Sequence, residues 1–124
     1  MFKKKSNVSG MVGVYLARFN SHLKLDEVPL NAGTAFSVGW AMKNGNSPGN
    51  GILVITNQRI FHCIDFGPLT LEVQKRDILK VASSDYPVKD NMVLHLTYLE
   101  NGEASYNSFY CSKPFTKEVV RFLK

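Results

Sequence analysis

The sequence has 124 residues, of which 44% are hydrophobic and 20% are charged, so its size and composition are typical of one globular domain. The formal net charge is +5, and residues 1–25 account for all of it, since they hold five basic residues and no acidic one. Residues 26–124 hold ten basic and ten acidic residues, which cancel. Because nucleic-acid affinity rests on phosphate neutralisation by a basic folded face, we do not expect a nucleic-acid partner.

The sequence has no stretch that is typical of a membrane span or a secretory signal. The longest uncharged run, Val28 to Met42, is shorter than the ~20 apolar residues that a spanning helix needs. Lys3 to Lys5 are followed by polar residues rather than by an apolar region. We therefore expect a cytoplasmic protein, peripheral to the membrane if it meets a membrane at all. Cys63 and Cys111 are expected to be free, small, buried residues.

The N-terminal part is predicted to be a basic flexible tail over residues 1–10 and an amphipathic helix over residues 11–24. The apolar stripe of this helix consists of Met11, Tyr15, Phe19 and Leu23. Two interpretations remain open: the stripe docks on the protein's own domain, or it is a face for a partner or a membrane. The candidate contacts to an anionic surface are Lys3, Lys4, Lys5, Arg18 and Lys24.

Residues 25–124 are predicted to form about seven strands and a closing helix. Thr34 to Met42, which includes Trp40, alternates small with large residues, so we expect a strand with one buried face. The central element is a half-buried hairpin, in which a turn at Thr56-Asn57-Gln58 joins Ile52–Ile55 to Arg59–Ile64. Its second strand is expected to place Ile60, His62, Ile64 and Phe66 on one face. The later strands are predicted within Leu69–Val73, Ile78–Val81, Met92–Leu99 and Glu103–Tyr110, with an Asn101-Gly102 hairpin turn.

The chain ends in a predicted amphipathic helix. Ser112 is the expected N-cap, and Pro114 fits the first turn, where its missing N–H is not needed. The apolar stripe of this helix consists of Phe115, Val119, Phe122 and Leu123. The expected architecture is mainly β with flanking helices (α+β): an antiparallel barrel or sandwich of about seven strands. The closing helix caps one open end.

The hairpin resembles that of bacterial pleckstrin-homology-like and GRAM-like domains. The shared motif, G-x-L-x-x-T-N-x-R-I, consists here of Gly51, Leu53, Thr56, Asn57, Arg59 and Ile60. The resemblance extends over residues 25–124, because Asp26-Glu27 precede the motif and Asp77-Ile78 and Pro114–Leu123 follow it in the family's order. It implies a pleckstrin-homology-like domain of a bacterial or phage cytoplasm that binds rather than catalyses.

The resemblance implies that the ligand is a protein partner or a second copy of the chain, with exposed barrel edges as one place for strand addition. Phosphoinositide-binding members carry several basic residues in the first strand and the following loop, whereas Thr34 to Asn50 contains only Lys43. One alternative is peripheral binding to anionic lipid through the basic N-terminal segment. A second alternative is a small enzyme whose site has no recognisable spacing.

No catalytic, cofactor-binding or metal-binding residue is predicted. The histidines and cysteines of the predicted strands, His62, Cys63, His95 and Cys111, match no metal-ligand spacing. Cys111 and His95 lack a third group that would orient them as nucleophile and base. Arg59 is expected to pair with an acidic residue or a loop carbonyl.

Overall fold

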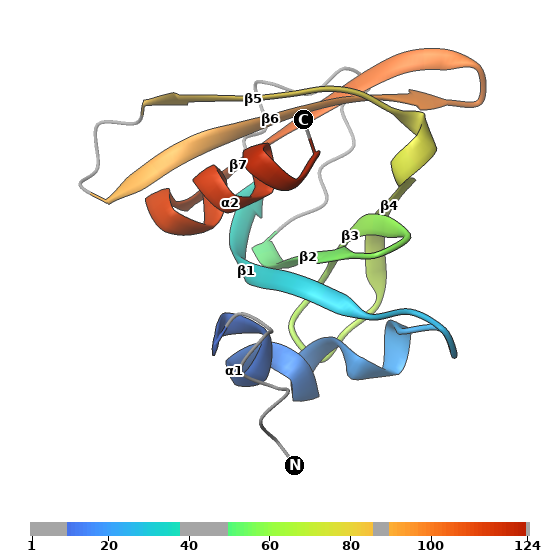
Figure 1. Ribbon diagram of the computed structural model, residues 1–124, viewed down its shortest axis with the longest axis vertical. Helices are drawn as coiled ribbons and strands as arrows, with labels where there is room; N and C mark the ends of the chain where they lie inside the picture. Colours follow the sequence, from blue (N-terminus) through green and yellow to red (C-terminus); the bar gives the residue numbers. More distant parts are fainter. Residues whose placement is uncertain (1–9, 38–49, 86–89, 124) are drawn as a thin grey trace.

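The computed structural model describes residues 10–37, 50–85 and 90–123 (Figure 1). These residues form two α-helices, two short 3-10 segments and seven strands. In chain order they are α1 (Gly10–Phe19), η2 (Asn20–His22), β1 (Pro29–Ser37), β2 (Asn50–Thr56), β3 (Arg59–Cys63), β4 (Leu69–Gln74), η4 (Lys75–Asp77), β5 (Ile78–Asp85), β6 (Asn91–Glu100), β7 (Glu103–Ser112) and α2 (Lys113–Leu123).

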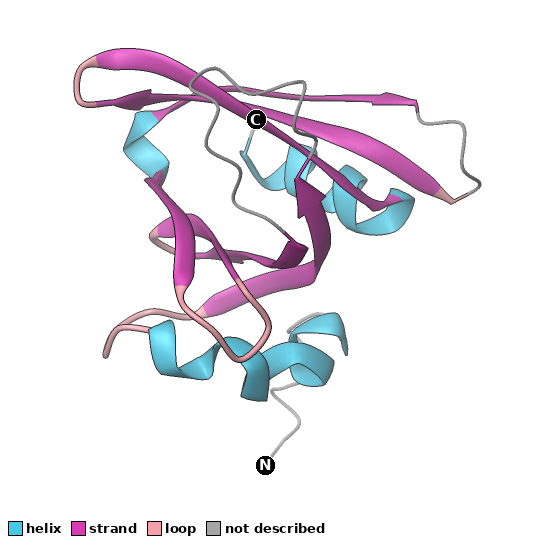
Figure 2. Cartoon of the chain, turned by 180° about the vertical axis from the view of Figure 1, so that it is seen from behind, coloured by secondary structure: helices cyan, strands magenta, loops and turns pink. Residues whose placement is uncertain are grey.

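The strands form one antiparallel sheet in the order β4-β3-β2-β1-β7-β6-β5. The sheet is bent, so that β5, β6 and β7 form one layer and β1 to β4 another, with α2 between them (Figure 1). Figure 2 shows from behind that α1 covers the other side of the second layer. The predicted mainly-β fold with seven strands and two flanking helices is confirmed. Within the described residues the sheet is not closed, because β4 and β5 remain its edges.

Two apolar clusters hold the layers together. The first lies between the two sheet layers and α2, and its buried members include Leu53, Ile55, Ile60, Leu94, Leu96, Phe109 and Phe115. The second lies between α1 and the sheet and contains Val12, Phe19, Ala32, Ile52, Val54, Phe61 and Cys63. Because successive strand residues point to opposite faces, β2 and β3 contribute to both clusters. The central hairpin is therefore confirmed, but it is buried on both faces rather than half-buried.

β1 differs from the predicted strand over Thr34 to Met42. It starts earlier, at Pro29, and Trp40 lies outside the described residues. The described part of the strand has the one buried face that was predicted: Ala35, on the face of small residues, is fully buried, whereas Phe36, on the opposite face, is 46% exposed. Close packing of α2 explains why the face of small residues is the buried one. A Cβ atom on Gly33 would lie 2.8 Å from the ring of Phe115, so α2 approaches β1 only where the strand is small.

The two helices were predicted with different accuracy. α1 ends at Phe19 and tightens into η2, because Asn20 and Ser21 are poor helix formers, and Leu23 has an extended backbone. α2 begins at the predicted place: the Oγ atom of Ser112 accepts a hydrogen bond from the N–H of Phe115 at 3.4 Å. Asn101 and Gly102, both with positive φ, form the predicted β6–β7 turn.

Candidate interaction surface

The motif residue Arg59 is the centre of a buried ionic cluster. Its guanidinium group donates to both carboxylate oxygens of Glu27, with Nε at 2.7 Å from Oε2 and Nη2 at 2.8 Å from Oε1. It also donates to the His22 carbonyl at 2.6 Å and to Glu72 at 2.9 Å, and it lies 4.5 Å above the ring centre of Phe61. The expectation that Arg59 pairs with an acid or a loop carbonyl is confirmed, and it pairs with both.

Two more motif residues attach the segment before β1 to the hairpin. The Thr56 hydroxyl donates to Glu27 at 2.7 Å and accepts from the N–H groups of Gln58 and Arg59, both at 3.1 Å. Asn57 exchanges hydrogen bonds with the backbone of Val28, accepting through its side chain at 2.8 Å and donating through its N–H at 3.0 Å. The T-N-x-R residues therefore stabilise the fold, and the side chains of Thr56 and Arg59 are buried.

The hydrogen bonds of this cluster lower the pKa of Glu27. Burial raises the pKa of a carboxyl group, but here the hydrogen bonds from Arg59, Thr56 and the Lys24 N–H outweigh burial. The pKa of Glu27 is lowered from 4.5 to about 2. The carboxylate is therefore ionised over the whole neutral range and holds Arg59 in place.

His62 and the two cysteine thiols lie in buried surroundings that are typical of structural residues. His62 donates from Nε2 to the Ala35 carbonyl at 3.1 Å, its Nδ1 lies 2.6 Å from the Thr70 hydroxyl, and burial lowers its pKa. Both cysteines are free and buried, as predicted. Burial raises the pKa of Cys63 to about 11 and that of Cys111 to about 12. Thiols of such high pKa are poor nucleophiles at neutral pH.

His95 belongs to a row of hydroxyls that crosses three strands. Its Nε2 lies 2.9 Å from the Ser84 hydroxyl of β5, and its Nδ1 lies 2.8 Å from the Ser108 hydroxyl of β7. Burial lowers the pKa of His95, which favours the neutral ring. Cys111 is in the first apolar cluster, on the other face of the sheet, so the structure does not bring it to His95. Sequence spacing cannot reveal this row, because it depends on the strand register.

A cleft opens between α1 and the start of β2. It has a volume of about 190 Å³ and is lined by Tyr15, Arg18, Thr34, Phe36, Asn50, Gly51, Ile52 and Asp65. The Tyr15 and Thr34 hydroxyls are hydrogen-bonded at 2.8 Å, and Arg18 Nε lies 3.5 Å from the Asp65 carboxylate. The guanidinium group of Arg18 also lies 5.4 Å from the ring centre of Tyr15. The cleft thus combines aromatic walls with a paired charge at its rim.

The β3–β4 turn (Ile64–Pro68) stands beside this cleft. Phe66, at its tip, is 73% exposed and has a φ of +57°, a left-handed conformation that is costly for a bulky residue. The turn is fixed by backbone hydrogen bonds between Ile64 and both Gly67 and Pro68, and His22 Nε2 donates to the Gly67 carbonyl at 2.7 Å. The expected continuation of the strand through Ile64 and Phe66 is wrong, because β3 ends at Cys63.

The predicted helix face lies against the protein's own sheet. Phe19 is fully buried and meets Phe61 edge-on at 6.1 Å between ring centres, and Tyr15 and Leu23 pack on the same cluster. The side chain of Met11 lies outside the described residues. The structure thus shows docking within the chain, which was the first of the two interpretations. It leaves this face no room for a separate partner at Phe19.

The described basic residues among the predicted anionic-surface contacts are each paired with an acidic side chain. Lys3, Lys4 and Lys5 lie outside the described residues. Arg18 pairs with Asp65, and Lys24 Nζ lies 3.8 Å from the Glu72 carboxylate.

At the expected sheet edges, β5 has a register irregularity between Ile78 and Lys80, which is a common way of protecting an edge strand.

The described residues offer neither a cluster of metal ligands nor a membrane-spanning helix. Over the described residues, no group of three or more His, Cys, Asp or Glu side chains is placed to hold a metal ion. In the same part of the chain, neither α-helix has the length and apolar character needed to cross a bilayer. Comparison of the sequence with protein-family models and with curated proteins gives no match.

Proposed function

We propose that this protein is a non-enzymatic interaction module that self-associates, with Phe66 of one copy inserted into the cleft of another. The observation that carries the proposal is the strained, exposed Phe66 in the turn beside an aromatic-lined cleft. The buried His62 and the high-pKa thiols, by contrast, offer little for catalysis. Local strain of this kind tends to be kept where it serves binding, and aromatic anchors dominate many protein interfaces.

The sizes of the two features are compatible. A cavity of about 150 Å³ is enough to hold a benzene ring, and the cleft has a volume of about 190 Å³. The walls supplied by Tyr15 and Phe36 suit an incoming ring, and Arg18 adds a cation at the rim. Because the cleft includes Asp65, the residue next to Phe66, each copy presents both features on one surface. That is what a two-fold interface requires.

We further propose that the module is related to pleckstrin-homology-like and GRAM-like domains. The motif residues Thr56, Asn57 and Arg59 support this, together with Glu27, which is one of the two acidic residues that precede the motif. The antiparallel strand order followed by a helix is compatible with the proposal. The relation concerns fold and mode of action, since the proposed binding surface is argued from Phe66 and the cleft.

The test is light scattering after size-exclusion chromatography, over concentrations from about 10 to about 500 µM, where mass action separates weak dimers from monomers. We expect the mean mass of the wild type to rise with concentration. Phe66→Ser should weaken association by about thirtyfold, the effect of losing an interface anchor. The matched control is Phe122→Ser, which removes the half-exposed phenylalanine of α2. Self-association is excluded if the wild type stays monomeric, and the Phe66 contact is excluded if both variants behave alike.

A further inference from the structure

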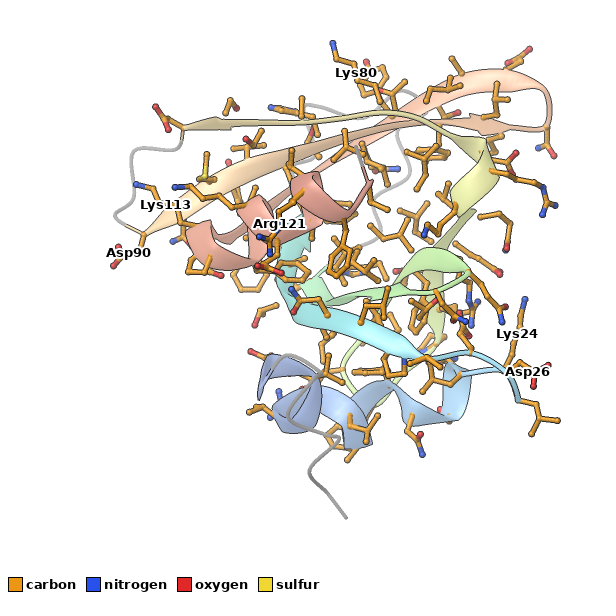
Figure 3. The ribbon with its side chains drawn as sticks, in the orientation of Figure 1. Lys24, Asp26, Lys80, Asp90, Lys113 and Arg121 are labelled. Carbon is orange, nitrogen blue, oxygen red and sulfur yellow. The ribbon has the colours of Figure 1, made fainter. Side chains whose placement is uncertain are left out.

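The layer formed by β5, β6 and β7 has a second face, which is turned away from α2. Leu94 and Leu96 of β6 belong to the first apolar cluster, so His95 between them points to the opposite side of the sheet. Lys80 of β5 pairs with Thr97, two residues after His95, and therefore lies on the same side as His95. Figure 3 shows that Lys80 projects away from α2 and from the layer of β1 to β4. The side chain of His95 is thus on the outer face of this layer.

Three polar side chains, one from each strand, form a row on this outer face. In the β6–β7 register Ser108 is directly opposite His95, and in the β5–β6 register Ser84 is two residues beyond Ala82, which is opposite His95. This register brings each hydroxyl to a different ring nitrogen: Ser84 lies 2.9 Å from Nε2, and Ser108 lies 2.8 Å from Nδ1. Both distances are those of hydrogen bonds. The row therefore joins a serine, an imidazole and a second hydroxyl, in that order.

The two hydroxyls of the row differ in exposure. Ser108 is 2% exposed, whereas Ser84 is exposed on β5, an edge strand of the described sheet. A buried hydroxyl can fix the orientation of the ring, and an exposed one can meet a molecule from solvent. His95 is half-buried, and burial lowers its pKa, so the neutral ring prevails at neutral pH. A neutral ring keeps one nitrogen able to accept a proton, which is what a general base needs.

We propose that Ser84 is a nucleophilic serine that takes up an acyl group from an activated ester, with His95 as its general base. Ser108 is a positioning residue: it accepts the hydrogen bond of Nδ1–H, and Nε2 is then left to accept the proton of Ser84. The Ser84 oxygen forms a bond to the carbonyl carbon of the ester, and the bond between that carbon and the leaving oxygen breaks. The proton passes through Nε2 to the leaving alcohol. The products are this alcohol and an ester of Ser84.

This step adds a covalent modification site to the proposed interaction module. The acceptor is the chain's own serine, so a single acyl transfer suffices and no turnover is required. The site is separate from the cleft, because it is built from β5, β6 and β7, whereas the cleft is lined from α1, β1, β2 and Asp65. Acylation of Ser84 therefore does not depend on self-association.

The test is incubation of the full chain with p-nitrophenyl acetate, with nitrophenolate release, intact mass and peptide mapping as readouts. We expect a single acetyl group on each chain, at Ser84, and Ser84→Ala should lose it. His95→Gln should slow the acetylation of Ser84 by about a hundredfold or more, which is the usual contribution of a general base. The matched control is Ser83→Ala, which should react as the wild type does. Ser83 is exposed on the same strand, but it pairs with Leu94 and so points to the other face.

The positioning role of Ser108 has a readout of its own. In the wild type, nitrogen NMR should find the proton of the neutral His95 ring on Nδ1, and Ser108→Ala should shift it toward Nε2 and slow acetylation. Thermal melting confirms that each variant is folded. The proposal is overturned if Ser84→Ala or His95→Gln is acetylated as fast as the wild type, or if Ser83→Ala loses the reaction equally. A ring proton on Nε2 in the wild type would exclude Ser108 as the positioning residue.

Discussion

The two helices of this protein solve the same packing problem in different ways. α2 buries Phe115, Thr116 and Val119 against the first apolar cluster and presents charged residues such as Lys117 and Arg121 to solvent. α1 buries Val12 and Phe19 against the second cluster, but its outward side is uncharged. α2 is therefore complete as a surface helix. α1 has a second, uncharged side that its own fold does not bury. The surface that the fold leaves unexplained therefore lies at the α1 end of the molecule.

The largest expected effect tests whether the packing of α1 contributes as much to the free energy of unfolding as the packing of α2. Phe19→Ala and Phe115→Ala each remove a ring from a buried cluster, and each should lower the free energy of unfolding by about 3–5 kcal/mol. Val14→Ala, on the outward side of α1, should change it by less than about 0.5 kcal/mol. Urea unfolding measures all three. A small cost for Phe19→Ala, with a large one for Phe115→Ala, would mean that α1 is only loosely attached.

The same comparison explains what sequence reasoning could and could not predict. The position of α2 was predicted correctly, because its charged face must be turned to solvent and Ser112 marks the residue at which the helix begins. The apolar stripe on α1 predicted which residues pack on the sheet. The opposite face of the helix is uncharged, and its sequence gives no indication of its role. β1 shows a related limit: alternation separates two faces without saying which is buried, and in β1 the buried face is the one with the small residues Gly33 and Ala35.

The candidate site was less predictable than the fold. The partners of Arg59 were foreseen as a class, because a buried guanidinium group must find acids or carbonyls. Phe66 was placed on a strand, since its spacing continues that of Ile60 and His62. Only the three-dimensional turn, with its positive φ, shows that this side chain projects into solvent. The cleft depends on how α1 lies against β1 and the start of β2, an arrangement of residues far apart in the sequence.

A second prediction uses pH to loosen one helix before the other. Glu27 connects the α1 end to the hairpin through Arg59, which also holds the His22 carbonyl. Its folded-state pKa of about 2 lies below the unfolded value of 4.5, so it stabilises the fold fully above about pH 4.5. That contribution, about 3 kcal/mol, is lost as the pH falls through about 2. Hydrogen exchange should therefore show α1 losing protection in acid before α2.

The control for this prediction is Glu27→Gln, which cannot ionise. Its stability should be lower at neutral pH, because the buried Arg59 loses its counter-ion, and it should fall less steeply between about pH 4.5 and about 2. His62 acts at higher pH, since burial lowers its pKa and protonation below its ordinary value of 6.5 opposes folding. Both proteins keep His62, so the difference between their curves isolates Glu27. Parallel curves for the two proteins would show that Glu27 does not anchor the α1 end.

The smallest effect compares two exposed phenylalanines, Phe66 beside the cleft and Phe122 on α2. Glycine adopts a φ of +57° without strain, so Phe66→Gly should raise the free energy of unfolding by about 1 kcal/mol. Phe122→Gly places glycine in a helix and should lower it by up to about 1 kcal/mol. Thermal melting of the two variants at low concentration, where mass action favours the monomer, measures both signs.

The opposite signs matter because they separate stability from binding. If Phe66→Gly is more stable than the wild type but no longer self-associates, then the strain at position 66 is maintained for the interface and not for the fold. If Phe66→Gly is less stable, the ring contributes to packing within its own copy, and its exposure is not a sign of function. A residue that costs the monomer stability and strengthens the dimer is hard to explain in any other way, since folding alone would favour glycine at that turn.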